Sequence, residues 1–212
     1  MVMVNRNKII LLVGSLSLVM LMAAVWLLFK RGPQPVQSIS PTGGVAEARY
    51  HFSESPIFLQ TDSRWASDEI GGSREPLSAV GCTICSLSMA LAHYGLEMTP
   101  DQLNERLKIK EGFTAQGWLK WDSVTEVTEQ KIRIDIPAKL SHETIDQALK
   151  ANQPVLAKIL LGGRIQHWVL IVGKSGQEYL IKDPLGDGKS LDTLSKYGSN
   201  IFAIRIVTSA RV

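Results

Sequence analysis

The sequence predicts an α+β domain in which helices come first and mostly antiparallel strands follow. One observation is an apolar run at helical spacing, VGCTICSLSMALAHYG, which Gly95 ends. A second is that short β-branched segments broken by glycines replace this period after Pro154. A third is composition: 212 residues, 45% of them apolar and 20% charged, with two cysteines. Such a chain folds around an apolar core and does not depend on a disulfide framework.

Charge is unevenly distributed along the chain. The formal net charge is +3, but the first 31 residues hold four of the 23 Lys and Arg residues and no Asp or Glu. From Gly32 onward, 19 basic residues therefore face 20 acidic ones. This part lacks the basic surface that a phosphate backbone requires, so we expect no nucleic-acid partner.

The N-terminus is predicted to be a membrane anchor, residues 1–31. Its segment 9–29, IILLVGSLSLVMLMAAVWLLF, carries no charge, and as a helix rising about 1.5 Å per residue it spans one hydrocarbon core. Lys30 and Arg31 follow it directly, without the small residues of a cleavage site. We expect an uncleaved single-pass helix in the cell membrane, with the domain on the extracytoplasmic side; a cleaved signal peptide is the alternative.

Two further regions follow the anchor. Residues 32–55 are rich in Pro, Gly, Ser and Gln and are predicted to be a flexible spacer. Residues 56–212 have the length of one globular domain. Within it, helices are predicted from Gly81 or Cys82 onward, after a Thr99 cap, over 117–127, and after a Ser141 cap. Strands are predicted over 56–60, 132–136, 155–161, 166–173, 178–182 and 201–207.

Two of these strands predict a contact between His167 and Asp183. Lys174-Ser175-Gly176 is a three-residue link that ends in glycine, as a common hairpin does. That register pairs Gly173 with Gln177, and further along the same hairpin it sets His167 opposite Asp183. The sequence therefore brings an imidazole to a carboxylate at the open end of the hairpin.

A nucleophile is predicted at Cys82. It lies in the presumed first turn of the apolar helix, where unpaired N–H groups and the helix dipole favour a thiolate. A thiolate nucleophile needs an oriented imidazole, which His167 and Asp183 provide, and a donor for an oxyanion. Gln60, at the end of the predicted strand 56–60, is the candidate donor, together with the Cys82 N–H.

Four motifs in this order resemble a known family. They are FLQTD with Trp65, then GC followed by SLSMA and YG, then HWV, then IKDP. Together they cover roughly residues 56–207 and look like papain-like cysteine peptidases related to the bacteriocin-leader (double-glycine) processing peptidases, of the stand-alone bacterial type. In one departure, Thr83-Ile84-Cys85 follows the cysteine where relatives often have Gly-Pro-Thr.

The resemblance implies a papain-like fold with the nucleophile helix packed on an antiparallel sheet. It also implies Cys82 as nucleophile, His167 as general base and acid, Asp183 as orienter and Gln60 in the oxyanion hole. We therefore expect a membrane-anchored thiol hydrolase that cleaves a peptide or related amide bond, without a cofactor or metal. Its partners would be a peptide or protein substrate and the membrane, with a transporter or secretion partner left open.

Three other interpretations stay open. Cys82-Thr83-Ile84-Cys85 has the spacing of thiol–disulfide oxidoreductases, although helices first and antiparallel strands last do not match the βαβ layout of that class. The two cysteines also suit zinc, but no histidine pair has ligand spacing. A catalytically silent peptide-binding module is the third, with Trp118, Trp121 and Trp168 as candidates to line a groove.

Overall fold

The computed structural model describes residues 37–52 and 54–210. Its sheet has six strands, all paired antiparallel, in the order β1-β4-β3-β6-β2, with β5 added to β4. The strands are β1 (Thr42–His51), β2 (Ile132–Asp135), β3 (Val155–Leu161), β4 (Ile165–Lys182), β5 (Asp192–Thr193) and β6 (Ala203–Ser209). The helices are α2 (Leu77–Val80), α3 (Cys82–His93), α4 (Pro100–Ile109), α5 (Ser123–Val127), α6 (His142–Lys150) and the 3₁₀ helix η1 (Leu194–Tyr197). The α+β class and the antiparallel sheet predicted from the sequence are confirmed.

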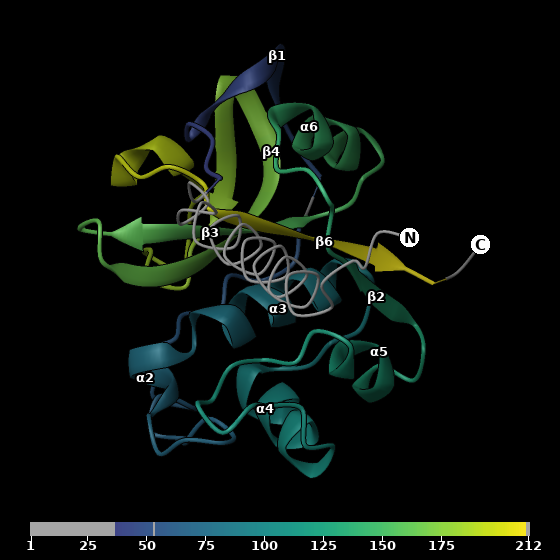
Figure 1. Ribbon diagram of the computed structural model, residues 1–212, viewed down its shortest axis with the longest axis vertical. Helices are drawn as coiled ribbons and strands as arrows, with labels where there is room; N and C mark the ends of the chain where they lie inside the picture. Colours follow the sequence, from purple (N-terminus) through teal and green to yellow (C-terminus); the bar gives the residue numbers. More distant parts are fainter. Residues whose placement is uncertain (1–36, 53, 211–212) are drawn as a thin grey trace, which may run out of the picture. The chain divides into compact units, whose positions relative to one another are not determined.

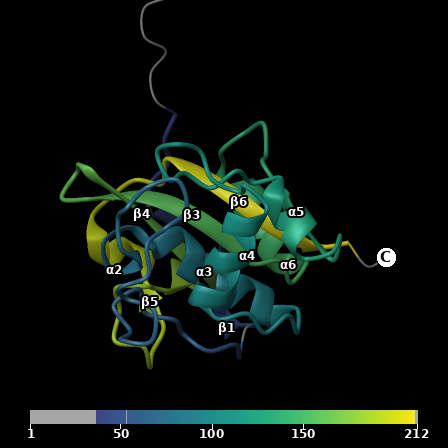
Figure 2. The ribbon, with the colours of Figure 1, turned by 90° about the horizontal axis from the view of Figure 1, so that it is seen from below.

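The two faces of the sheet carry different helices (Figure 1). Alternate residues of β3 and β4 face opposite sides, because side chains along a strand alternate. Leu156 and Leu170 pack in the cluster that holds the buried side of α3, whereas Val155 and Ile171 pack in the cluster that holds α6. Seen from below, α3 and α4 lie in front of the sheet (Figure 2).

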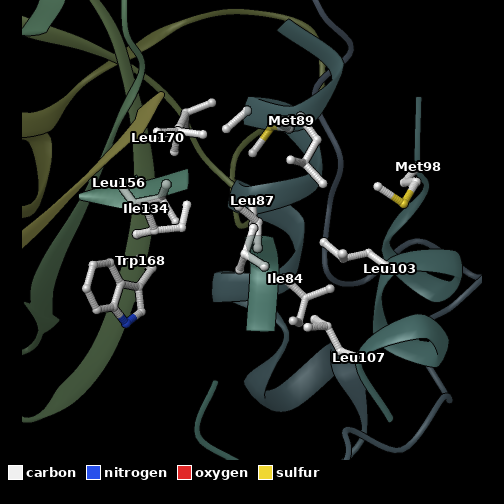
Figure 3. Packing of buried hydrophobic residues seen from close by; sticks show 14 of the residues in the cluster. Ile84, Leu87, Met89, Met98, Leu103, Leu107, Ile134, Leu156, Trp168 and Leu170 are labelled. Carbon is white, nitrogen blue, oxygen red and sulfur yellow. The ribbon is translucent and has the colours of Figure 1, made fainter. Parts of the chain in front are cut away.

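Helix α3 is buried between the sheet and α4. Ile84 and Leu87 are completely buried, and Figure 3 shows them between Leu156 on the sheet side and Leu107 of α4. Because apolar residues surround this helix, its position is fixed by packing on both sides. The first residue of α3, Cys82, is therefore held in place against the sheet.

The predicted caps of two helices are confirmed. The Gln102 side chain accepts a hydrogen bond from the Thr99 N–H at 3.1 Å, and Pro100 is the first residue of α4. Ser141 Oγ accepts from the Thr144 N–H at 3.2 Å at the start of α6.

Two predicted elements differ from the structure. Residues 56–59 form no strand; Ile57 and Phe58 pack against the core while the backbone runs as a loop. The helix predicted over 117–127 is limited to Ser123–Val127. Gly117 has a left-handed backbone with φ +78°, which no helix accommodates, and Trp118 is largely exposed and so adds little apolar burial to sustain one.

The predicted spacer 32–55 also needs correction, because it contains strand β1. Thr42–His51 pairs with β4 along the edge of the sheet, from Thr42 opposite Glu178 to His51 opposite Gly173. Most of its side chains are exposed, so the segment lacks the apolar alternation by which strands are found in a sequence. The predicted anchor helix 9–29 lies outside the described residues; among residues 37–52 and 54–210 no helix is long and apolar enough to cross a membrane.

Candidate active site

Cys82 begins helix α3, as the sequence predicts. The turn before it needs glycine, because a Cβ on Gly81 would lie 2.4 Å from the Leu77 carbonyl oxygen. The short helix α2 can therefore run directly into α3, with Cys82 at the junction. Cys82 as a whole residue keeps a small exposed fraction, 8%, whereas Cys85 one turn later has none.

His167 and Asp183 are in direct contact. His167 Nε2 lies 2.8 Å from Asp183 Oδ1, and both side chains are buried. An extended strand rises about 3.3 Å per residue, so two residues 16 positions apart would lie roughly 53 Å from each other if β4 were straight. The 18-residue run of β4 therefore folds back on itself, and Gly176, with φ +61°, lies where the sequence predicts the link.

The His167 ring also interacts with Cys82. Burial alone would lower the pKa of His167, but the hydrogen bond with Asp183 and the nearby Cys82 outweigh burial and raise that pKa to about 9. Because Nε2 faces Asp183, the nitrogen left for the thiol is Nδ1. The ring thus contacts the acid through Nε2 and lies within electrostatic reach of the Cys82 sulfur.

Four donors surround the Asp183 carboxylate. Oδ1 accepts from His167 and, at 2.9 Å, from the Leu185 N–H. Oδ2 accepts from the Tyr197 hydroxyl and lies 2.9 Å from the Lys196 ammonium. Burial would raise the pKa of Asp183, but these hydrogen bonds, with that from His167 the strongest, hold it below the usual range. Asp183 is therefore ionised at neutral pH.

Gln60 lies between the two parts of the site. Its backbone N–H donates to the Pro184 carbonyl at 3.0 Å, next to Asp183, and its side-chain Nε2 donates to the Ser78 carbonyl at 2.7 Å, in the helix before Cys82. The side chain is buried, and its Oε1 has no hydrogen-bond partner among the described residues. One hydrogen of Nε2 remains after the bond to Ser78.

Tyr197 and Lys196 also belong to the site, although neither is predicted from the sequence. Tyr197 places its ring 5.9 Å from the His167 ring, edge to face, besides donating to Asp183. Lys196 bonds a second acid, Asp192, at 2.6 Å. The only signal in the sequence is an acid and a lysine four residues apart, which is too common to single out a site.

The remaining chemistry-bearing groups are placed differently. Cys82 and Cys85 are both free thiols, and burial, followed by the nearby Cys82 and Asp62, raises the pKa of Cys85 far above its usual value. In the part of the chain that the structure describes, no three His, Cys, Asp or Glu side chains are grouped to hold a metal ion. A hollow of about 980 Å³ lies between Ser67 and α4, and its lining contains none of the four predicted site residues.

Comparison with known proteins identifies the family. The model of the Peptidase C39 family matches residues 78–200, which include Cys82, His167 and Asp183 but not Gln60. The chain is 30% identical over 117 residues to the lactococcin-G-processing and transport ATP-binding protein LagD of Lactococcus lactis subsp. lactis, covering 55% of this chain and 16% of that protein. It is 26% identical over 104 residues to the mesentericin-Y105 transport/processing ATP-binding protein MesD of Leuconostoc mesenteroides, covering 49% and 13%.

The match thus spans less than a fifth of the length of either curated relative. Among solved structures, a putative C39-like peptidase from Bacillus anthracis aligns with 76% of this chain and 98% of its own, at 15% identity and a TM-score of 0.46. The family model covers more than half of the chain. The chain therefore belongs to the peptidase C39 family and is a cysteine peptidase.

Proposed function

We propose that the protein cleaves a peptide bond with Cys82 as nucleophile, His167 as base and acid, Asp183 as orienting acid and Gln60 as oxyanion donor. The main support is the position of the His167 ring, which contacts Asp183 through Nε2 and lies near enough to Cys82 for the thiol to raise the pKa of His167. A base held on one side by an acid and facing a thiol on the other is the arrangement that nucleophilic catalysis requires.

The reaction follows from these positions. The Cys82 thiolate attacks the carbonyl carbon, and the oxyanion that forms accepts hydrogen bonds from Gln60 Nε2 and the Cys82 N–H. The C–N bond then breaks, and the His167 imidazolium gives its proton to the leaving amine. A water molecule, deprotonated by His167, attacks the thioester, which releases the acid and restores the thiol.

The first test is the loss of the nucleophile. The Cys82→Ala variant should show no cleavage of a peptide that carries a double-glycine leader, the substrate class suggested by the processing function in the names of LagD and MesD. His167→Ala should be equally inactive. Unaltered cleavage by Cys82→Ala would remove the nucleophile assignment, and mass spectrometry of the thioester in the active chain would support it.

Gln60 is tested by a matched pair of variants. Gln60→Ala removes the donor and should lower kcat by about 10²–10³-fold, the range seen when one oxyanion donor is lost. Gln60→Glu keeps the shape but replaces the amide donor by a carboxylate, so it should be at least as impaired. Loss of Asp183 should cost a similar factor, because the imidazole loses its orientation. A Gln60→Glu variant with normal kcat would contradict the role of Gln60.

Location and partner form the last part of the proposal. We infer that residues 9–29 anchor the peptidase as a single-pass helix in the cell membrane, with the domain outside the cytoplasm. We also infer that a transporter is a candidate partner, because both curated relatives are named as transport ATP-binding proteins. The full chain should sediment with membranes, and protease added to intact protoplasts should digest the domain. A full chain that stays in the supernatant would contradict the anchor.

A further inference from the structure

Lys196 lies against the Asp183 carboxylate without touching His167 in any hydrogen bond or ion pair that the described residues form. Its ammonium is 2.9 Å from Asp183 Oδ2, on the side of the carboxylate opposite the His167 contact through Oδ1. Asp183 is buried, with 1% of its side chain exposed, whereas 31% of the Lys196 side chain is exposed. A surface cation thus reaches down onto a buried acid.

A second acid holds Lys196 in this position. Asp192 Oδ2 accepts from the ammonium at 2.6 Å, four residues earlier in the chain. Asp192 belongs to β5, which pairs with β4 through Ile181, two residues from Asp183. The ammonium also lies 4.8 Å from the centre of the Tyr197 ring. Because Lys196 is fixed by three groups, its charge stays near Asp183.

Few other charges act on the His167 ring. Helix α3 contributes Cys82, the end of β4 contributes Asp183, and η1 contributes the Tyr197 ring. Strand β3 places the apolar Ile159 opposite His167. A buried carboxylate in direct contact with an imidazole favours the protonated ring strongly, because water does not screen the pair. Lys196 is the cation bound to that carboxylate.

On these contacts, and on the assumption that the proposed function is right, we propose that Lys196 is a positioning residue that acts on the site through Asp183. Its ammonium, held by Asp192, offsets the charge of Asp183 and so limits how firmly Asp183 keeps a proton on His167. The orienting acid then holds the ring in place without retaining the proton that the ring must give to the leaving amine and accept again from water.

The test is the protonation of His167, followed by NMR of the ring carbons in the full chain. It is measured in a Cys82→Ala background, so that the thiol does not titrate with the ring. Lys196→Met and Lys196→Gln should each raise the pKa of His167 by about one unit, since each removes a nearby opposite charge from Asp183. Lys196→Arg should restore the pKa, because it restores the charge. Lys189→Met, on an exposed lysine of the preceding loop, is the matched control and should leave the pKa unchanged.

A second background separates charge compensation from a structural role. In Asp183→Asn the partly exposed Lys196 side chain loses the carboxylate that draws its ammonium toward the ring, so Lys196→Gln should shift the pKa of His167 by less than a few tenths of a unit. An equal shift of the His167 pKa in both backgrounds, or no shift in the background that retains Asp183, would overturn the proposal. Because the titration uses no substrate and no nucleophile, it stands even if Cys82→Ala proves active and the proposed function fails. In the chain that retains Cys82, the fall of kcat/KM at high pH should occur at higher pH in Lys196→Gln than in the wild type.

Discussion

Ser86 Oγ donates a hydrogen bond to the Trp168 carbonyl at 3.1 Å, and both residues are buried. The bond joins the helix that begins with Cys82 to the strand residue that follows His167. It therefore fixes the sulfur and the imidazole relative to one another, although 85 residues separate them in the chain. Apolar packing alone would allow small slides between a helix and a sheet, which a directional bond resists.

Ser86→Ala is expected to lower the free energy of unfolding by about 1–3 kcal/mol, because the Trp168 carbonyl is left buried without its donor. Helix α3 supplies a matched control in Ser88, which is also fully buried but whose Oγ has no partner among the described residues. Ser88→Ala should be neutral or stabilising. Urea unfolding of both variants checks this, and equal losses of stability would contradict it.

Loss of the His167 proton should make the protein less stable as the pH rises above neutral. The folded pKa is about 9, above the value near 6.5 of an unfolded histidine. Its contribution to stability is therefore complete below about pH 6.5 and is lost as the pH rises toward 9, by at most about 1.4 kcal/mol per pH unit. Asp183 behaves oppositely: its lowered pKa contributes stability above about pH 4, which is lost as the pH falls further.

The measurement compares the wild type with His167→Gln by urea unfolding between pH 6 and 9. The comparison is needed because the wild-type curve also contains the titration of Lys182. Burial lowers the pKa of Lys182 to about 8, so its titration raises the stability of the protein above pH 8. The decline in the free energy of unfolding with rising pH should be absent in His167→Gln. His93→Gln is the control, since burial lowers the pKa of His93, so its linkage has the opposite sign and its removal should not abolish the decline. A wild type and a His167→Gln variant with the same slope would contradict the assignment.

Substitution of Cys85 distinguishes a peptidase from a thiol–disulfide oxidoreductase. Its thiol is fully buried and its pKa is raised, so it is a poor thiolate at neutral pH. Cys85→Ser should retain peptide cleavage within a few-fold, although a buried hydroxyl costs about 1–3 kcal/mol of stability. An oxidoreductase would lose disulfide exchange. The insulin-reduction assay and peptide cleavage, run side by side on Cys85→Ser and Cys82→Ala, distinguish the two.

The contact between His167 and Asp183 was predictable because it is local. A three-residue link with a terminal glycine sets the register of the strands on both sides, and the pairing follows without knowledge of the rest of the fold. The start of α3 at Cys82 was predictable for a similar reason, because helical spacing and glycines are read over one short segment. Both predictions use interactions within 20 residues.

Interactions across the chain were not predictable in this way. Lys174 belongs to the same link and, as a turn residue, would be expected in solvent, yet it is completely buried. Strand β1, more than 120 residues earlier, covers Lys174. Strand β1 itself lacks the apolar alternation by which a strand is predicted from a sequence. Tyr197 and Lys196 reach Asp183 from η1, whose position depends on how β5 pairs with β4. Such contacts become visible only when the strands are assembled.

Lys174 also yields the last prediction, which concerns the attachment of β1. Its ammonium donates to the Gly43 carbonyl at 2.9 Å, the Val45 carbonyl at 2.6 Å and Asp146 Oδ1 at 2.8 Å, while Asp146 Oδ2 accepts from the Val45 N–H at 2.7 Å. Glycine is needed at 44, because its φ is +72° and a Cβ would lie 2.1 Å from Asp146 Oδ2. One buried ion pair therefore binds the start of β1 to β4 and α6.

Lys174→Met should lower the free energy of unfolding by about 3–5 kcal/mol, because it leaves the buried Asp146 carboxylate without its cation. Adding Asp146→Asn should recover part of this loss, since the uncompensated charge is removed. Lys150→Met is the control: its pair with Glu47 also joins α6 to β1 at 3.5 Å, but it is solvent-exposed and should cost less than about 1 kcal/mol. Amide hydrogen exchange over Thr42–His51 should be faster in Lys174→Met but not in Lys150→Met. Equal exchange rates in these two variants would show that β1 is held by its backbone pairing instead.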